Sequence, residues 1–75
     1  MNQSPVPQLE RPIEVGFFDA LRATLKGKRI TRVAWGNSDY GMVRETLLKI
    51  KKDDAWYNWI ISTADMEAGD WVVLE

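Results

Sequence analysis

The spacing of apolar residues predicts one helix in the first half of the chain. Phe17, Ala20, Leu21, Thr24 and Leu25 fall at offsets of 0, 3, 4, 7 and 8, so a helix would place them on one side. A glycine precedes this stripe and a Lys-Gly pair follows it, which suits the two ends of a helix. We therefore expect a helix that buries one face.

The middle of the chain predicts strands joined by turns. Residues 28–33 contain β-branched positions between basic ones and indicate a strand, and residues 34–41 are rich in turn formers and indicate a loop. Residues 42–51 fit a helix or a strand by periodicity alone. A turn at Asp53 and Asp54 between two apolar runs favours a hairpin over residues 47–61.

The last part of the chain predicts a short helical turn followed by a strand. Ser62 and Thr63 can accept hydrogen bonds from the free amide groups of a helical turn over residues 64–68. Gly69 is expected to end that turn in a left-handed conformation, and residues 70–74 alternate as a strand does.

Together these elements predict an α+β fold. We expect a small antiparallel sheet with one N-terminal helix packed on it and a short helical turn before the last strand. Residues 1–16 carry three prolines among polar residues and are interpreted as an extended lead-in. Residues 17–75 are expected to form a single domain.

Composition narrows the ways in which so short a chain can be stabilised. A chain of 75 residues has little interior, and the absence of Cys and His excludes disulfides and a Cys/His zinc site. Four Trp residues are more aromatic surface than a small monomer easily hides. We therefore expect a homo-oligomer.

The charge balance restricts the partners. A formal net charge of −1 argues against a dedicated partner of polymeric nucleic acid, yet it is compatible with a small anionic ligand. No apolar run reaches the roughly 20 residues of a membrane span, so no membrane partner is expected. Lack of Cys and of a signal-peptide pattern fits a cytoplasmic protein.

The inventory of reactive side chains favours binding over catalysis. Without His or Cys, the commonest general base and the thiol nucleophile are missing. Asp53, Asp54, Asp65 and Asp70 could hold Mg²⁺, but their positions suit turns and caps. We therefore expect no enzyme, no metal site and no cofactor.

Two groups of residues are candidates for ligand binding. Arg32, Trp35 and Asn37 combine a charge for phosphate, a ring for a base and an amide for its edge, and they leave the first strand together. Singly, each also suits a structural role, as a solvated strand residue, a core or interface aromatic, and a turn residue.

The second group is Ser62, Thr63 and Asp65, which suit helix capping and could also bind an anion at the helix N-terminus. Trp59 and Trp71 are expected in the core or a subunit interface. The lysines at positions 49, 51 and 52 are interpreted as a solvated strand edge.

Three segments in fixed order resemble a known family. They are residues 17–28, residues 32–37 (Arg-Val-Ala-Trp-Gly-Asn), and residues 59–71 with Ser62, Asp65 and the closing Asp-Trp pair. This set resembles the small phage proteins of the Thoeris anti-defence two family. Relative to that family, residues 1–16 are an extension, the connection between residues 41 and 54 is shorter than in many members, and Met66-Glu67 replaces a more apolar pair.

The resemblance implies a function. Members of this family bind, without cleaving, the cyclic ADP-ribose-type signal made by a bacterial TIR-domain protein, and some also hold cyclic di- or trinucleotides. They assemble as oligomers, typically tetramers, and act in the cytoplasm of the bacterial host. The resemblance assigns ligand contact to Arg32, Trp35, Asn37, Ser62, Thr63 and Asp65. The alternatives are a protein-protein inhibitor of a host defence enzyme and a metal-dependent phosphodiesterase.

Overall fold

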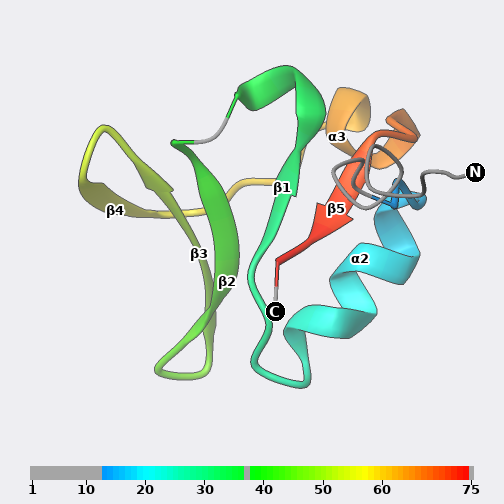
Figure 1. Cartoon of the computed structure of the whole chain (residues 1–75). Helices are drawn as coiled ribbons and strands as arrows, with labels where there is room; N and C mark the ends of the chain where they lie inside the picture. Colours follow the sequence, from blue (N-terminus) through cyan, green and yellow to red (C-terminus); the bar gives the residue numbers. More distant parts are fainter. Residues whose placement is uncertain (1–12, 37, 75) are drawn as a thin grey trace, which may run out of the picture.

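One antiparallel sheet with strand order β4-β3-β2-β1-β5 organises the protein in a computed structural model that describes residues 13–36 and 38–74. A helix lies on one side of the sheet (Figure 1), and the α+β class predicted from the sequence is confirmed. The elements are, in chain order, α2 (Phe17–Thr24), β1 (Ile30–Arg32), the 3-10 helix η1 (Val33–Trp35), β2 (Tyr40–Arg44), β3 (Leu47–Lys52), β4 (Ala55–Asn58), α3 (Thr63–Glu67) and β5 (Trp71–Val73).

Helix α2 follows the predicted stripe until its last position. Phe17, Ala20 and Thr24 are buried against the sheet, and the Thr24 hydroxyl donates to the Leu21 carbonyl at 2.6 Å. Leu25, which the stripe placed in the core, is the C-cap residue and is exposed. The chain turns away there, with Gly27 at a φ of 86°.

The segment before α2 is tied to the edge of the sheet. Val15 N–H donates to the Trp71 carbonyl at 2.8 Å, and Trp71 N–H donates to the Val15 carbonyl at 3.1 Å. This bridge pairs part of the outer edge of β5 and fixes where α2 begins. Residues 1–12 of the predicted lead-in lie outside the described residues.

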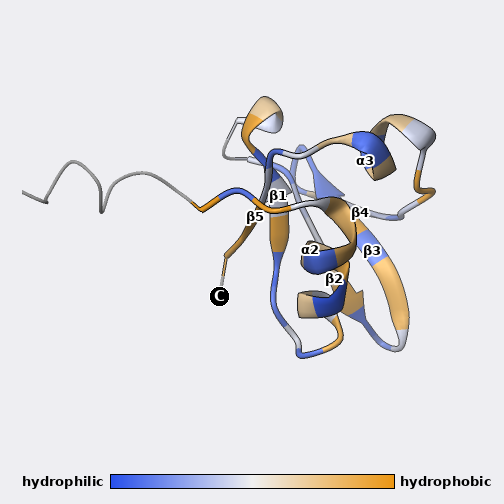
Figure 2. Cartoon of the chain, turned by 90° about the vertical axis from the view of Figure 1, so that its right-hand side faces the viewer, coloured by the Kyte–Doolittle hydropathy of each residue, from blue (hydrophilic) through white to orange (hydrophobic). Residues whose placement is uncertain are grey.

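Two tight hairpins build the other half of the sheet. The predicted turn at Asp53 and Asp54 joins β3 to β4, and a second turn at Glu45 and Thr46 joins β2 to β3. The loop predicted over residues 34–41 is wrong at both ends, because residues 33–35 form η1 and β2 already begins at Tyr40. Colouring by hydropathy shows apolar and polar positions alternating along β3 (Figure 2).

Two further expectations for the C-terminal part need correction. The strand predicted to run to residue 61 ends at Asn58, after which Trp59 leaves the sheet plane and turns into the core. Gly69 does not adopt the left-handed conformation, and α3 instead ends at Ala68 in an extended conformation. The order of a capped helical turn and then a strand is as predicted.

The core lies between α2 and the sheet and is mainly aromatic. Its buried members are Phe17, Ala20, Ile30, Ile50, Trp59 and Trp71. The Phe17 ring centre lies 5.3 Å from that of Trp71 and 6.2 Å from that of Trp59. Trp59 and Trp71 are therefore core residues in this chain. Of the helices in the described part, none has the length and apolar character to cross a membrane.

The Gly41 site is set by the ring of Trp59. A Cβ added at Gly41 would lie 2.4 Å from the Trp59 ring, closer than real Cβ atoms approach other atoms. The ring cannot retreat without disturbing the rest of the buried aromatic cluster. A strand glycine whose missing side chain is replaced by an aromatic ring is a known device for holding a ring against a sheet.

Gly41→Ala is expected to lower the free energy of unfolding by about 1 to 3 kcal/mol, because overpacking displaces the Trp59 ring. Denaturant unfolding followed by tryptophan fluorescence measures this. Gly69→Ala is the matched control, since a Cβ there meets nothing within 4 Å and the backbone φ is not positive. Equal stability of the two variants would contradict the packing argument.

The Glu45-Thr46 turn offers a stabilising substitution. Both residues have positive φ, 55° and 68°, as a type I′ hairpin turn requires, and this conformation is costly for a β-branched residue. The double change Glu45→Asn and Thr46→Gly should therefore raise stability by about 1 kcal/mol. The same replacement at Asp53 and Asp54 should give a smaller gain in thermal unfolding, because Asp tolerates this region. The reverse order would refute the explanation.

Candidate functional site

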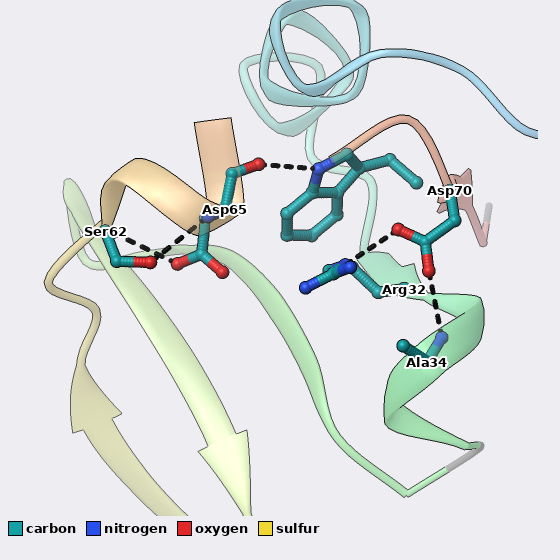
Figure 3. A network of polar contacts seen from close by, with 6 residues as sticks. Arg32, Ala34, Ser62, Asp65 and Asp70 are labelled. Atoms are coloured by element: carbon teal, nitrogen blue, oxygen red, sulfur yellow. Dashed lines mark hydrogen bonds and ion pairs between the residues drawn. The ribbon is translucent and has the colours of Figure 1, made fainter. Parts of the chain in front are cut away.

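A network of polar contacts surrounds Trp71 where β1, η1 and β5 meet (Figure 3). Arg32 Nε donates to Asp70 Oδ1 at 2.7 Å, and Ala34 N–H donates to Asp70 Oδ2 at 3.0 Å. The Arg32 guanidinium carbon lies 5.9 Å from the centre of the Trp71 ring. Arg32, predicted to offer a charge to phosphate, thus has an internal carboxylate partner.

The environment of Asp70 changes its acidity. Burial alone would raise the pKa of this carboxyl, but the hydrogen bonds from Arg32 and Ala34 and the nearby Arg32 charge outweigh burial. The pKa of Asp70 therefore lies below its ordinary value. A carboxylate held ionised in this way is a weak proton acceptor, so it suits a structural role better than that of a general base.

Asp65 connects α3 to both core tryptophans. Its carboxylate accepts from Ser62 N–H at 3.2 Å, and the Ser62 hydroxyl accepts from Asp65 N–H at 3.1 Å, which completes a capping box. The same carboxylate oxygen accepts from Trp59 Nε1 at 3.3 Å, and the Asp65 carbonyl accepts from Trp71 Nε1 at 3.0 Å. Capping and indole binding thus use the same residue.

Of the six candidate residues, Arg32, Trp35 and Asp65 are gathered around Trp71. The half-buried Trp35 ring meets the rings of Trp71 and Trp59 edge to face, with centres 5.2 Å and 5.9 Å apart. Ser62 is the N-cap of α3, while Thr63 is its first residue and is exposed. Asn37 lies outside the described residues.

An open groove of about 530 Å³ lies beside this corner, between the β3–β4 hairpin and the start of α3. This volume falls within the range of small-molecule sites. The lining residues are Ile50, Lys52, Asp53, Tyr57, Asn58, Trp59, Ile60 and Asp65. Among the predicted ligand residues, Asp65 is the member that lines it.

The groove combines the chemistry that was expected around Arg32, but with other residues. Tyr57 supplies an exposed ring, Lys52 a cation and Asn58 an amide, above a floor that includes Trp59 and Ile50. Lys52 has no carboxylate partner within 4.0 Å in the described part of the chain. Tyr57 and Lys52 therefore keep an exposed ring and an unpaired charge, which the aromatic corner does not.

These residues could have been found from the hairpin. A two-residue turn at Asp53 and Asp54 fixes Lys52 opposite Ala55 and Ile50 opposite Tyr57. Tyr57 and Lys52 then share the face of the apolar Ile50, which marks them as polar groups beside the core. Recognition of the turn without its register left them unassigned.

Comparison with known protein families, with curated proteins and with solved structures gave no match. Within residues 13–36 and 38–74, no group of three His, Cys, Asp or Glu side chains is arranged to hold a metal ion. The four aspartates considered for Mg²⁺ lie in separate settings: Asp54 is near Lys51, Asp65 caps α3 and Asp70 pairs with Arg32.

The Arg32–Asp70 pair should make stability depend on acid pH. Its side chains are only 22% and 23% exposed, so Asp70→Asn should lower the free energy of unfolding by about 1 to 3 kcal/mol at neutral pH. A lowered pKa means that the native state binds fewer protons than the unfolded chain. The contribution is therefore complete above about pH 4 and is lost as the pH falls through the pKa of Asp70.

Denaturant unfolding of the parent and the variant between pH 2 and pH 7 measures this difference. Asp19→Asn is the control, because the Arg22–Asp19 pair is 67% and 66% exposed and should contribute well under 1 kcal/mol. A stability difference for Asp70→Asn that stays constant down to pH 2 would contradict the assignment.

Proposed function

We propose that this protein binds a cyclic nucleotide in the groove beside α3 and holds it without cleaving it. The observation that carries the proposal is the lining of that groove, where an unpaired cation, an exposed aromatic ring and an amide surround an apolar floor. Lys52 would meet phosphate, Tyr57 would stack on a base or ribose, and Asn58 would bind a base edge.

The state of the carboxylates supports binding over turnover. Asp65 is engaged by Ser62 and Trp59, and Asp70 by Arg32 and Ala34. Neither is free to activate water as it stands. This favours a sequestering role over the alternative of a metal-dependent phosphodiesterase.

The choice of a cyclic nucleotide rests on the resemblance to the anti-defence sponge proteins. In that role the protein would lower the free concentration of a cyclic ADP-ribose isomer or a cyclic oligonucleotide, and so block a bacterial anti-phage response. The groove is large enough for such a ligand. Arg32 and Trp35 would support the site from behind, through the core tryptophans.

Assembly into a homo-oligomer, and specifically a tetramer, belongs to the same proposal. Ile60 lies at the groove and is 88% exposed, and Phe18 on α2 is also exposed. A second copy that covered these side chains would remove apolar surface from water and enclose the groove. The same exposed groups are what the runner-up function, inhibition of a host defence enzyme by direct contact, would use.

A thermal-shift panel of cyclic nucleotides and ADP-ribose isomers tests the function. A ligand that binds only the folded protein raises the unfolding temperature, and heat release of that ligand should return it chemically intact. Degraded ligand would favour the phosphodiesterase. No shift with any nucleotide, together with capture of one host protein, would favour the inhibitor.

Lys52→Gln should weaken binding of the nucleotide found in that panel by about 1.5 to 3 kcal/mol, because it removes a charge-assisted contact. Titration calorimetry measures this, and Lys28→Gln, an exposed lysine that does not line the groove, should bind like the parent. Tyr57→Phe should retain binding and Tyr57→Ala should lose it. Unchanged affinity in Lys52→Gln and Tyr57→Ala would remove the groove as the site.

A further inference from the structure

The side of the sheet that faces away from α2 carries a second concentration of cations and aromatic rings. Gly41 and Ile50 face the core, so their strand neighbours point to the other side. The open sheet face is defined here by the exposed or half-buried residues Arg29, Tyr40, Arg44, Lys49, Lys51 and Trp56. It is separated from the groove by the thickness of the sheet.

The lysines of this face do not serve the purpose that the sequence suggested. Lys49 and Lys51 lie on β3, which is an internal strand between β2 and β4, so they do not protect a sheet edge. Tyr40, Lys51 and Trp56 instead form one row across the three strands. The prediction of a solvated strand edge is therefore wrong for these two lysines.

Rings and cations are layered on this face. The Arg44 guanidinium carbon lies 4.3 Å from the centre of the Trp56 ring, and the Tyr40 ring has Arg29 at 5.2 Å and Lys51 at 5.7 Å. The Tyr40 and Trp56 rings meet edge to face at 5.6 Å. The aromatic rings thus hold the cations in place beside one another.

The positive charge of the face is largely uncompensated. Among residues 13–36 and 38–74, no carboxylate lies within 4.0 Å of Arg29, Arg44 or Lys49, and the Lys51–Asp54 contact is long, at 3.8 Å, with Asp54 exposed. Glu45 and Asp54 lie in the turns at either end of β3. The net charge of the whole chain, −1, conceals this local excess.

A shallow hollow of about 190 Å³ completes the arrangement, lined by Arg44, Glu45, Lys49 and Trp56. Its cations can meet phosphate oxygens, and the outer plane of the Arg44 guanidinium is parallel chemistry to the surface on which RNA-binding proteins stack unpaired bases. Cations two residues apart on β3 lie about 7 Å apart, so successive anionic groups of one strand could be met in turn.

We propose that the open sheet face binds a short single-stranded nucleic acid. Phosphates contact Arg29, Lys49 and Lys51, and a base stacks on the Arg44–Trp56 layer. The aromatic layer distinguishes this occupant from an acidic protein segment, which would need the cations but not a flat stacking surface. The total charge balance argued against a dedicated polymer-binding protein, whereas this proposal concerns one face and a short strand.

Fluorescence anisotropy with labelled ten-nucleotide oligo(dT) and oligo(U) at 50 to 300 mM salt tests the proposal. Combined Arg44→Gln, Lys49→Gln and Lys51→Gln should weaken binding at least about tenfold at low salt. The slope of log affinity against log salt should fall in magnitude by about 2, at roughly 0.7 for each lost phosphate contact. The control, Lys26→Gln with Lys28→Gln, removes cations from the turn after α2 and should bind like the parent.

A second variant separates stacking from charge and also covers the case that the triple variant unfolds. Arg44→Lys keeps the charge and loses the planar group, so affinity should fall about fivefold or more while the salt slope stays constant. The proposal is overturned if neither oligonucleotide binds at 50 mM salt, or if Arg44→Lys binds like the parent. It is also overturned if a ten-residue polyglutamate competes as well as oligo(dT), which would identify an acidic protein segment as the partner.

Discussion

The packing of Trp59 against Gly41 is the constraint on which the rest of the structure depends. A chain without disulfides or a zinc site must stabilise itself by burial, and most of its buried volume is contributed by a few aromatic rings. The Trp59 ring reaches the sheet only because β2 has no side chain at Gly41. Once it is seated there, Phe17 and Trp71 pack on it, and the position of α2 over the sheet follows.

Polar contacts fix the orientation of these rings. Buried indole N–H groups need acceptors, and Asp65 supplies both of them, one from its side chain and one from its backbone. The same residue caps α3, so the helix end and the core are positioned by one set of hydrogen bonds. The Arg32–Asp70 pair does the same on the other side of Trp71 by joining β1 to the residue before β5.

The sequence was sufficient for features that depend on local chemistry and insufficient for those that depend on register. The stripe beginning at Phe17 and the cap at Ser62 are written in a few adjacent residues, and both were predicted. The Glu45-Thr46 turn was missed because neither residue favours positive φ, and the β2–β3 pairing imposes it. Tyr57 entered the candidate site only through its partner across the hairpin, which periodicity does not reveal.

The order of the strands has a consequence for how firmly the two walls of the groove are held. β4 is an outermost strand, hydrogen-bonded to β3 alone, so Tyr57 belongs to a part of the sheet with little support. Trp59, one residue past the end of that strand's neighbour Asn58, is anchored in the densest part of the core. Local opening of the hairpin therefore requires much less free energy than global unfolding, and amide hydrogens of β4 exchange sooner than those of β1. The groove has one rigid side and one compliant side, which lets a single sequence admit ligands of different girth without disturbing its core.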